Sequence, residues 1–206
     1  YAFLVGEIAN QRGQGAVASE AYLDLAKSTR DPRIAERATQ IALAARQLPK
    51  ALTAAQLWKE LDPGAANASQ TVTALLVSQG KLGEAAAPLK ALLASEGSEA
   101  GNTFMHALLA KQSDKVGVLQ LVRDVAKGYE KMPESHFAIA QAAGNAKQFD
   151  VTKNETIIAL KLKPDWEQAA LLHSDALRQL EGKPAVAMAF LKNFVAANKG
   201  AREARL

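Results

Sequence analysis

Apolar residues recur every three or four positions along most of the chain, a spacing that predicts amphipathic helices. The clearest stretch carries Val17, Ala18, Ala21, Tyr22 and Leu25, which would line one side of a helix. Short polar turns separate these stretches, at residues 12–15, 47–49, 79–82, 112–114, 148–150 and 181–184. The pattern therefore predicts an all-α chain of antiparallel helix pairs.

The helix pairs repeat at a nearly constant interval. Ala18, Ala51 and Ala85 each open the second helix of a pair, and they lie 33 and 34 residues apart. The second pair ends at Leu61-Asp62-Pro63, and a similar ending recurs at Leu162-Lys163-Pro164. A period in this range is typical of helical repeat arrays, in which each unit buries its apolar face only against its neighbours.

Local signals place the ends of several helices. Asp31 followed by Pro32 is a favourable start, because Asp caps the helix and Pro suits its first position. In the first turn, Gly13 and Gly15 are expected to adopt positive φ. Pro88 falls inside a second helix, where it removes one backbone hydrogen bond.

Six helix pairs are predicted within one domain, residues 1–206. The fourth pair is irregular: residues 104–109 form its first helix and residues 118–125 its second. A bend is predicted near 111–133, because the stretch up to Met132-Pro133 is longer than the other connections. An incomplete seventh unit is predicted from residue 201 onward.

This order of residues resembles the tetratricopeptide repeat family. That family has a small residue in the first helix, glycine at the turn, alanine opening the second helix and proline closing the unit. The matching positions are Gly6, Gly13, Gly15, Ala18 and Tyr22 in the first unit; Thr39, Arg46, Leu48, Ala51, Ala55 and Pro63 in the second; and Thr73, Gly80, Leu82, Ala85 and Leu89 in the third. Departures from the pattern are Thr39, Thr73 and Thr152 at small-residue positions and Arg46 at the turn.

The resemblance implies a right-handed α-solenoid of about six antiparallel helix pairs, with the first helices lining a concave wall. The stretches from Phe3 to Ala9 and from Arg30 to Arg33 are also similar to exported repeat proteins of Gram-negative bacteria. A periplasmic or envelope-associated location is therefore expected, and a cytoplasmic one is the alternative. Because the chain begins at Tyr1 without methionine, we expect residues upstream of it to have been removed.

Composition narrows the function classes. Aromatic residues make up only 5% of the chain, and its apolar share is rich in alanine, which favours closely stacked helices. The 25 basic and 21 acidic residues are interleaved, so the net charge of +4 does not indicate a nucleic-acid surface. No cysteine is present, which excludes disulfides and thiolate chemistry. No apolar run approaches the roughly 20 residues of a membrane span.

The sequence contains no motif that predicts catalysis. Phosphate-binding loops, nucleophile elbows, zinc-protease pairs and calcium loops are all missing. His106, His136 and His173 fall on successive first helices, but stacked units lie about 10 Å apart, too far for these short side chains to share one zinc ion. We therefore predict no enzyme activity, no cofactor and no metal site, and interpret the histidines as packing or groove residues.

Trp58 and Trp166 are interpreted as core packing and as a staple at a helix start, rather than as anchors for a partner. Met188, Phe190 and Phe194 are interpreted as core or end-cap residues. If they stayed uncovered, they would indicate self-association through an end unit.

The leading functional hypothesis is a non-catalytic scaffold that binds a peptide or partner helix in its concave groove, in bacterial envelope assembly. Polar residues of the first helices are the predicted binding residues: Glu7, Asn10, Gln11, Arg33, Glu36, Gln40, Asn67, Gln70, Gln141 and Asp175. One alternative is a helical accessory region of a larger envelope enzyme whose catalytic part lies elsewhere. A second alternative, RNA binding by helical repeats, is disfavoured because the positions that would read bases show no recurring pattern.

Overall fold

The computed structural model describes residues 2–96, 112–182 and 184–204. These residues fall into two compact units, one formed within residues 1–112 and the other within residues 113–206. Every element in the described ranges is a helix. The predicted first helix of the fourth pair, including His106, lies outside the described residues. The single domain and the bend near 111–133 stay predictions.

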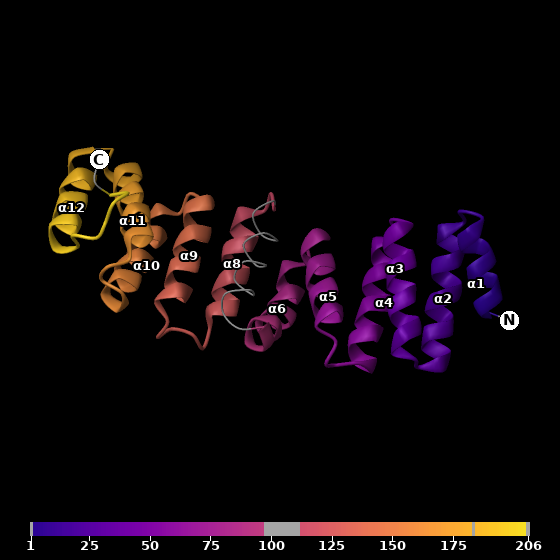
Figure 1. The fold of residues 1–206 in the computed structure, drawn as a ribbon. Helices are drawn as coiled ribbons and strands as arrows, with labels where there is room; N and C mark the ends of the chain where they lie inside the picture. Colours follow the sequence, from indigo (N-terminus) through magenta and orange to yellow (C-terminus); the bar gives the residue numbers. More distant parts are fainter. Residues whose placement is uncertain (1, 97–111, 183, 205–206) are drawn as a thin grey trace. The chain divides into compact units, whose positions relative to one another are not determined.

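The first unit contains three consecutive helix hairpins, whose helices stand side by side in chain order (Figure 1). Its helices are α1 (Ala2–Gln11), α2 (Gly15–Thr29), α3 (Pro32–Ala44), α4 (Leu48–Leu61), α5 (Ala66–Ser78) and α6 (Leu82–Glu96). Each second helix packs on its own first helix, and α2 and α4 also pack on the first helix of the next hairpin.

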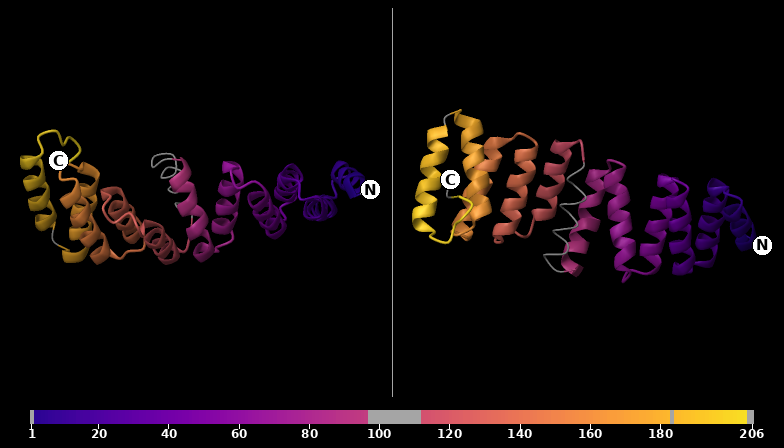
Figure 2. Two further views of the ribbon diagram at one scale, coloured as in Figure 1. Left: turned by 90° about the horizontal axis from the view of Figure 1, so that it is seen from below. Right: turned by 45° about the horizontal axis from the view of Figure 1, so that its top comes forward.

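In the second unit, each described helix also packs on the next one along the chain (Figure 2). Its helices are α8 (Lys115–Ala126), α9 (Pro133–Asn145), α10 (Phe149–Leu162), α11 (Glu167–Glu181) and α12 (Pro184–Ala197). After α12, residues 201–204 form no helix, and Ala201 and Ala204 are buried in a cluster with Leu191 and Phe194. Tandem helix hairpins thus confirm the predicted all-α solenoid class.

Most of the local signals are confirmed. The Asp31 side chain accepts a hydrogen bond from the backbone N–H of Arg33 at 2.9 Å, with Pro32 opening α3. Pro88 lies inside α6, and Trp58 is buried in the core. Several of the predicted turns extend too far along the sequence, because the helices α2, α4, α6 and α10 already begin at Gly15, Leu48, Leu82 and Phe149.

One turn geometry closes four of the hairpins despite different sequences. Residues Gly13, Arg46, Gly80 and Lys147 all have φ between 54° and 71°. In each turn, the following residue donates its backbone N–H to a carbonyl five positions earlier, as Gln14 does to Ala9 at 2.9 Å. This is the Schellman motif, which satisfies the free carbonyls at a helix end. Arg46 and Lys147 therefore hold a left-handed conformation that favours glycine.

Replacing either Arg46 or Lys147 with glycine is expected to stabilise its unit by about 0.5–1 kcal/mol, because a side chain in the left-handed region costs roughly 1–2 kcal/mol and glycine's greater unfolded-state entropy offsets part of this. Chemical denaturation would measure the change. The fluorescence of Trp58 reports on the first unit and that of Trp166 on the second, since these are the two tryptophans of the chain. Alanine at position 46 keeps a Cβ and should give no gain; equal stabilisation by alanine would contradict the explanation.

Threonine replaces the small first-helix residue without leaving its hydroxyl unpaired. Thr39 and Thr73 are buried, and each donates its hydroxyl to a carbonyl four residues earlier, at 2.8 Å. Thr152 replaces the alanine of a second helix instead; it is buried, and its hydroxyl lies 3.2 Å from the Gln148 carbonyl oxygen and 3.3 Å from the Ala140 carbonyl oxygen on α9. Because the hydroxyls of Thr39 and Thr73 bond within their own helices, only a methyl-sized group faces the neighbouring helix there.

Two expectations about side chains were wrong. Gly15 does not adopt positive φ but begins α2, and a Cβ there would lie 2.6 Å from the Cβ of Ala45. Its role is close approach between neighbouring hairpins. Val17, predicted on the apolar stripe of α2, is 51% exposed, because the buried side of this helix runs through Ala18, Tyr22 and Leu23 instead.

Candidate functional site

The predicted binding residues lie on the first helices, as expected from the repeat pattern. Eight belong to α1, α3 and α5 in the first unit, while Gln141 is on α9 and Asp175 on α11. We call the eight predicted binding residues of the first unit the first-helix face. Five of the ten residues are exposed: Asn10, Gln11, Arg33, Gln40 and Asn67. Their binding role stays a prediction.

Glu7 is held by the protein itself. Its carboxylate accepts a hydrogen bond from the Tyr22 hydroxyl, and a guanidinium nitrogen of Arg37 lies 3.8 Å from the same oxygen. Tyr22 is buried, and this burial, together with the bond to Glu7, raises the pKa of its phenol. The contact links α1, α2 and α3. Arg37 was missed at the sequence level, where nothing distinguishes it from other surface arginines.

On α3, the charged residues are also paired locally. Two guanidinium nitrogens of Arg33 lie 3.1 and 2.7 Å from the carboxylate oxygens of Asp31, and this arginine holds the pKa of Asp31 below its usual value. The Gln40 amide donates to the Glu36 carboxylate at 3.2 Å. The charges of this helix are therefore largely satisfied before any partner arrives.

In the second unit, Asp175 pairs with Arg178 one turn along α11. Gln141 is half-buried, and its amide oxygen is enclosed without a hydrogen-bond partner among the described residues. Phe137, one turn before Gln141, packs on Trp166 with 4.5 Å between ring centroids, and the Lys163 ammonium lies 4.9 Å from the Trp166 ring. Trp166 directly precedes α11, so its predicted place at a helix start is correct.

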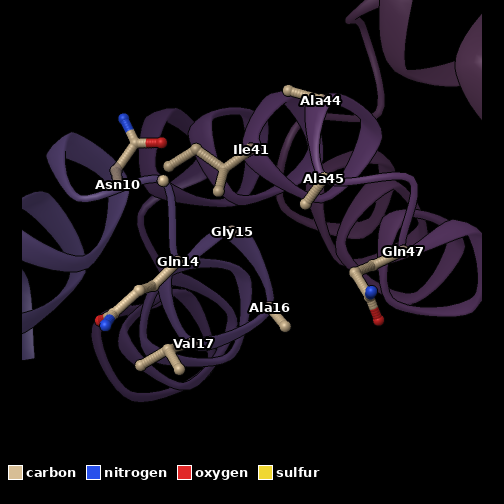
Figure 3. A pocket seen from close by; sticks show the side chains of 10 residues that line it. Asn10, Gln14, Gly15, Ala16, Val17, Ile41, Ala44, Ala45 and Gln47 are labelled. Carbon is tan, nitrogen blue, oxygen red and sulfur yellow. The ribbon is translucent and has the colours of Figure 1, made fainter.

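A cleft of about 490 Å³ lies where the turn of the first hairpin meets the end of α3 (Figure 3). Its lining contains no charged residue: it consists of Asn10, Gly13, Gln14, Gly15, Ala16, Val17, Ile41, Ala44, Ala45 and Gln47. Of these, only Asn10 was predicted as a binding residue. The sequence signal was present in the two glycines of the turn, whose predicted role was chain reversal alone.

The two described histidines have separate partners on α10. His136 Nε2 donates to the Glu130 carbonyl oxygen at 2.8 Å, and Nδ1 lies 2.7 Å from a Glu155 carboxylate oxygen. His173 is buried beside Phe190, and its Nδ1 lies 2.8 Å from the Thr156 hydroxyl oxygen. Burial lowers the pKa of His173; a hydrogen bond to the Lys153 backbone opposes this shift, and the Lys153 charge adds to it. Within the described residues, no group of three His, Asp or Glu side chains is placed to hold a metal ion.

Stability of the second unit is expected to fall as the pH drops from about 7 toward 5. The folded-state pKa of His173 lies below its unfolded value near 6.5, so the unfolded chain binds the proton first. The slope contributed by this one group can reach about 1.4 kcal/mol per pH unit. Urea denaturation followed by Trp166 fluorescence in a Trp58→Phe background would measure it. His173→Asn should reduce the dependence of stability on pH. An unchanged slope would show that a group other than His173 causes the dependence.

Comparison with known proteins adds a sequence relative. No protein-family model matches the chain. The chain is 30% identical over 132 residues to a TPR repeat-containing protein of Pseudomonas aeruginosa, and this match covers 63% of the chain. The resemblance to tetratricopeptide repeat proteins is confirmed. The match covers only 22% of the length of that relative.

Solved tetratricopeptide repeat structures also align with the chain. The C-terminal part of a TPR repeat-containing protein from Cytophaga hutchinsonii is 14% identical, with a TM-score of 0.48, and the alignment covers 94% of this chain and 78% of that one. YrrB, described as a TPR protein with an unusual peptide-binding site, is 17% identical with a TM-score of 0.49, covering 91% and 97%. No helix among the described residues is long and apolar enough to cross a membrane.

Proposed function

We propose that the chain is a non-catalytic protein-interaction scaffold that binds an extended peptide or a partner helix on its first-helix face. The observation that carries the proposal is a set of exposed amides, Asn10 and Gln11 on α1 and Asn67 on α5. Each amide offers both a donor and an acceptor, which is the chemistry that recognises a peptide backbone. The charged residues nearby are occupied by partners within the protein.

A matched pair of triple variants tests this proposal. Asn10, Gln11 and Asn67 are replaced with alanine in one variant; Gln56, Asn154 and Asn193, exposed amides on second helices, are replaced in the other. Proteins captured by the tagged chain from a bacterial envelope extract are identified, and the affinity of the main ligand is then measured. Three hydrogen bonds at about 1 kcal/mol each predict a roughly 100-fold weaker Kd for the first variant.

The second-helix variant should bind as the unsubstituted chain does. If the first-helix variant retains every ligand with unchanged affinity, binding on the first-helix face is refuted. If both variants lose binding to the same extent, the loss results from a general change of the surface, and the proposed site is also refuted.

We also propose a location in the bacterial cell envelope. It is supported by the absence of cysteine, which suits exported proteins, and by the resemblance of the opening residues to exported repeat proteins. Fractionation of cells producing the full-length tagged protein tests the location. Recovery in the cytoplasm alone would overturn it.

A second candidate function is an accessory region of a larger envelope enzyme. The Pseudomonas relative favours this candidate in one respect, because the match covers only 22% of that protein. Sequencing the complete gene and assaying its full product would distinguish the two candidates.

A further inference from the structure

The outer side of α1 carries an apolar surface that nothing in the described residues covers. Leu4 is 62% exposed, Val5 36% and Ile8 48%. We call these three residues the α1 apolar face. These residues are not members of the first-helix face. Asn10 lies on another side of α1, whereas Gln11, seven residues after Leu4, borders the α1 apolar face.

The repeat itself indicates what such a surface packs against. Gly6, Thr39 and Thr73 are equivalent, because each precedes the alanine of its second helix by 12 residues. Two residues beyond them lie Ile8, Ile41 and Leu75, which are 48%, 4% and 5% exposed. One residue before Gly6, Thr39 and Thr73 lie Val5, Ala38 and Val72, which are 36%, 1% and 3% exposed.

In the later hairpins, a second helix covers these positions. Ile41 and Ala38 share one buried cluster with Tyr22 and Leu23 of α2, and α5 packs on α4 in the same order. Val5 and Ile8 of the α1 apolar face therefore continue the interface by which one hairpin stacks on the one before it, whereas the position of Leu4 is held in the second hairpin by the exposed Arg37.

We propose that the α1 apolar face binds the second helix of a further tetratricopeptide hairpin in the same polypeptide, packed on α1 as α2 packs on α3. The partner helix needs a stripe that combines small residues with one or two large ones. On α2 that stripe is provided by Ala18, Tyr22, Leu23 and Ala26.

A second copy of the chain fits this surface less well. A ten-residue helix is only about 15 Å long, and pairing two of them buries far less than the roughly 1,200–2,000 Å² of a stable specific interface. On the last second helix, α12, Ala201 and Ala204 pack against Leu191 and Phe194, although Met188 stays 44% exposed. A hairpin in the same polypeptide avoids the translational entropy cost of association.

An extended chain tests the proposal directly. A copy of residues 32–67 is placed ahead of Tyr1, so that the repeat period is maintained. The copy of α4 is then expected to pack on α1 in the way that α4 packs on α5. Amide hydrogen exchange of α1 is expected to slow at least tenfold in the extended chain. Ile8→Glu should abolish that protection, while Val116→Glu, at another exposed apolar site on α8, should preserve it.

Two outcomes would overturn the inference. Unchanged exchange in α1 of the extended chain would show that the face does not accept a second helix, since the added hairpin is the one that covers α5. A dimer of the unextended chain in sedimentation at micromolar concentration, lost in Ile8→Glu, would identify a second copy as the occupant instead.

Discussion

Replacing Tyr22 with alanine is expected to lower the free energy of unfolding of the first unit by about 3–5 kcal/mol. The Tyr22 ring is 2% exposed, and its hydroxyl donates to Glu7. Truncation therefore leaves a cavity between α1 and α2 and removes a partly buried hydrogen bond. Denaturation followed by Trp58 fluorescence in a Trp166→Phe background measures the first unit alone. A loss below about 1 kcal/mol would mean that the ring is not a core element.

The same site offers a double-mutant cycle. A Cβ at residue 6 would lie 2.7 Å from Tyr22 Cε2 and 2.8 Å from Cδ2, so Gly6→Ala alone should cost about 1–3 kcal/mol by overpacking. In the Tyr22→Ala background the obstacle is gone. There, alanine should stabilise α1 by up to about 1 kcal/mol through helix propensity. Additive effects of the two substitutions would contradict the close approach.

Replacing Gly15 with alanine is expected to destabilise the first unit by about 2–3 kcal/mol, close to the upper limit for overpacking. The added Cβ would lie 2.6 Å from the Cβ of Ala45 and 3.4 Å from its Cα. Neither atom can rotate away, so the first hairpin must separate from the second. Thermal unfolding monitored by circular dichroism gives the size of the loss.

Gly83 provides the matched control. It also stands at the start of a second helix, but no atom lies within 4 Å of the position that an added Cβ would take. Gly83→Ala should leave stability unchanged or raise it by up to about 1 kcal/mol. Similar losses at the two glycines would attribute the effect to helix starts in general rather than to contact with Ala45.

The repeat period and the helix signals were sufficient to predict the fold. Alanines such as Ala18 and Ala51 mark close helix contacts wherever they recur, because backbone packing at that position tolerates little else. Turn positions were less well predicted. At Gln47 and Gln148, backbone hydrogen bonds determine where the second helix begins, and no side chain in the sequence indicates these bonds.

The candidate site was predicted only in part. Position within a repeat identified Asn10, Gln11 and Asn67 as exposed on first helices, but it could not identify internal pairing. Glu7 is engaged by Tyr22 from a different helix, and that contact depends on the absence of a side chain at Gly6. A large side chain at one position and a missing side chain at another become neighbours only in the folded protein, so the repeat pattern of the sequence does not reveal such pairs.

The contact between Gly6 and Tyr22 has a consequence for how the chain assembles. In the second hairpin, the equivalent positions are held by Thr39 and Ala55. The larger residue is therefore on the first helix of that hairpin, whereas in the first hairpin it is on the second helix. If α2 docked on α3 in the place of α4, the tyrosine ring would collide with threonine. Reciprocal volumes of this kind disfavour an exchange of helices between the first two hairpins and so protect them against swapped misfolding, a characteristic failure of repeated sequences.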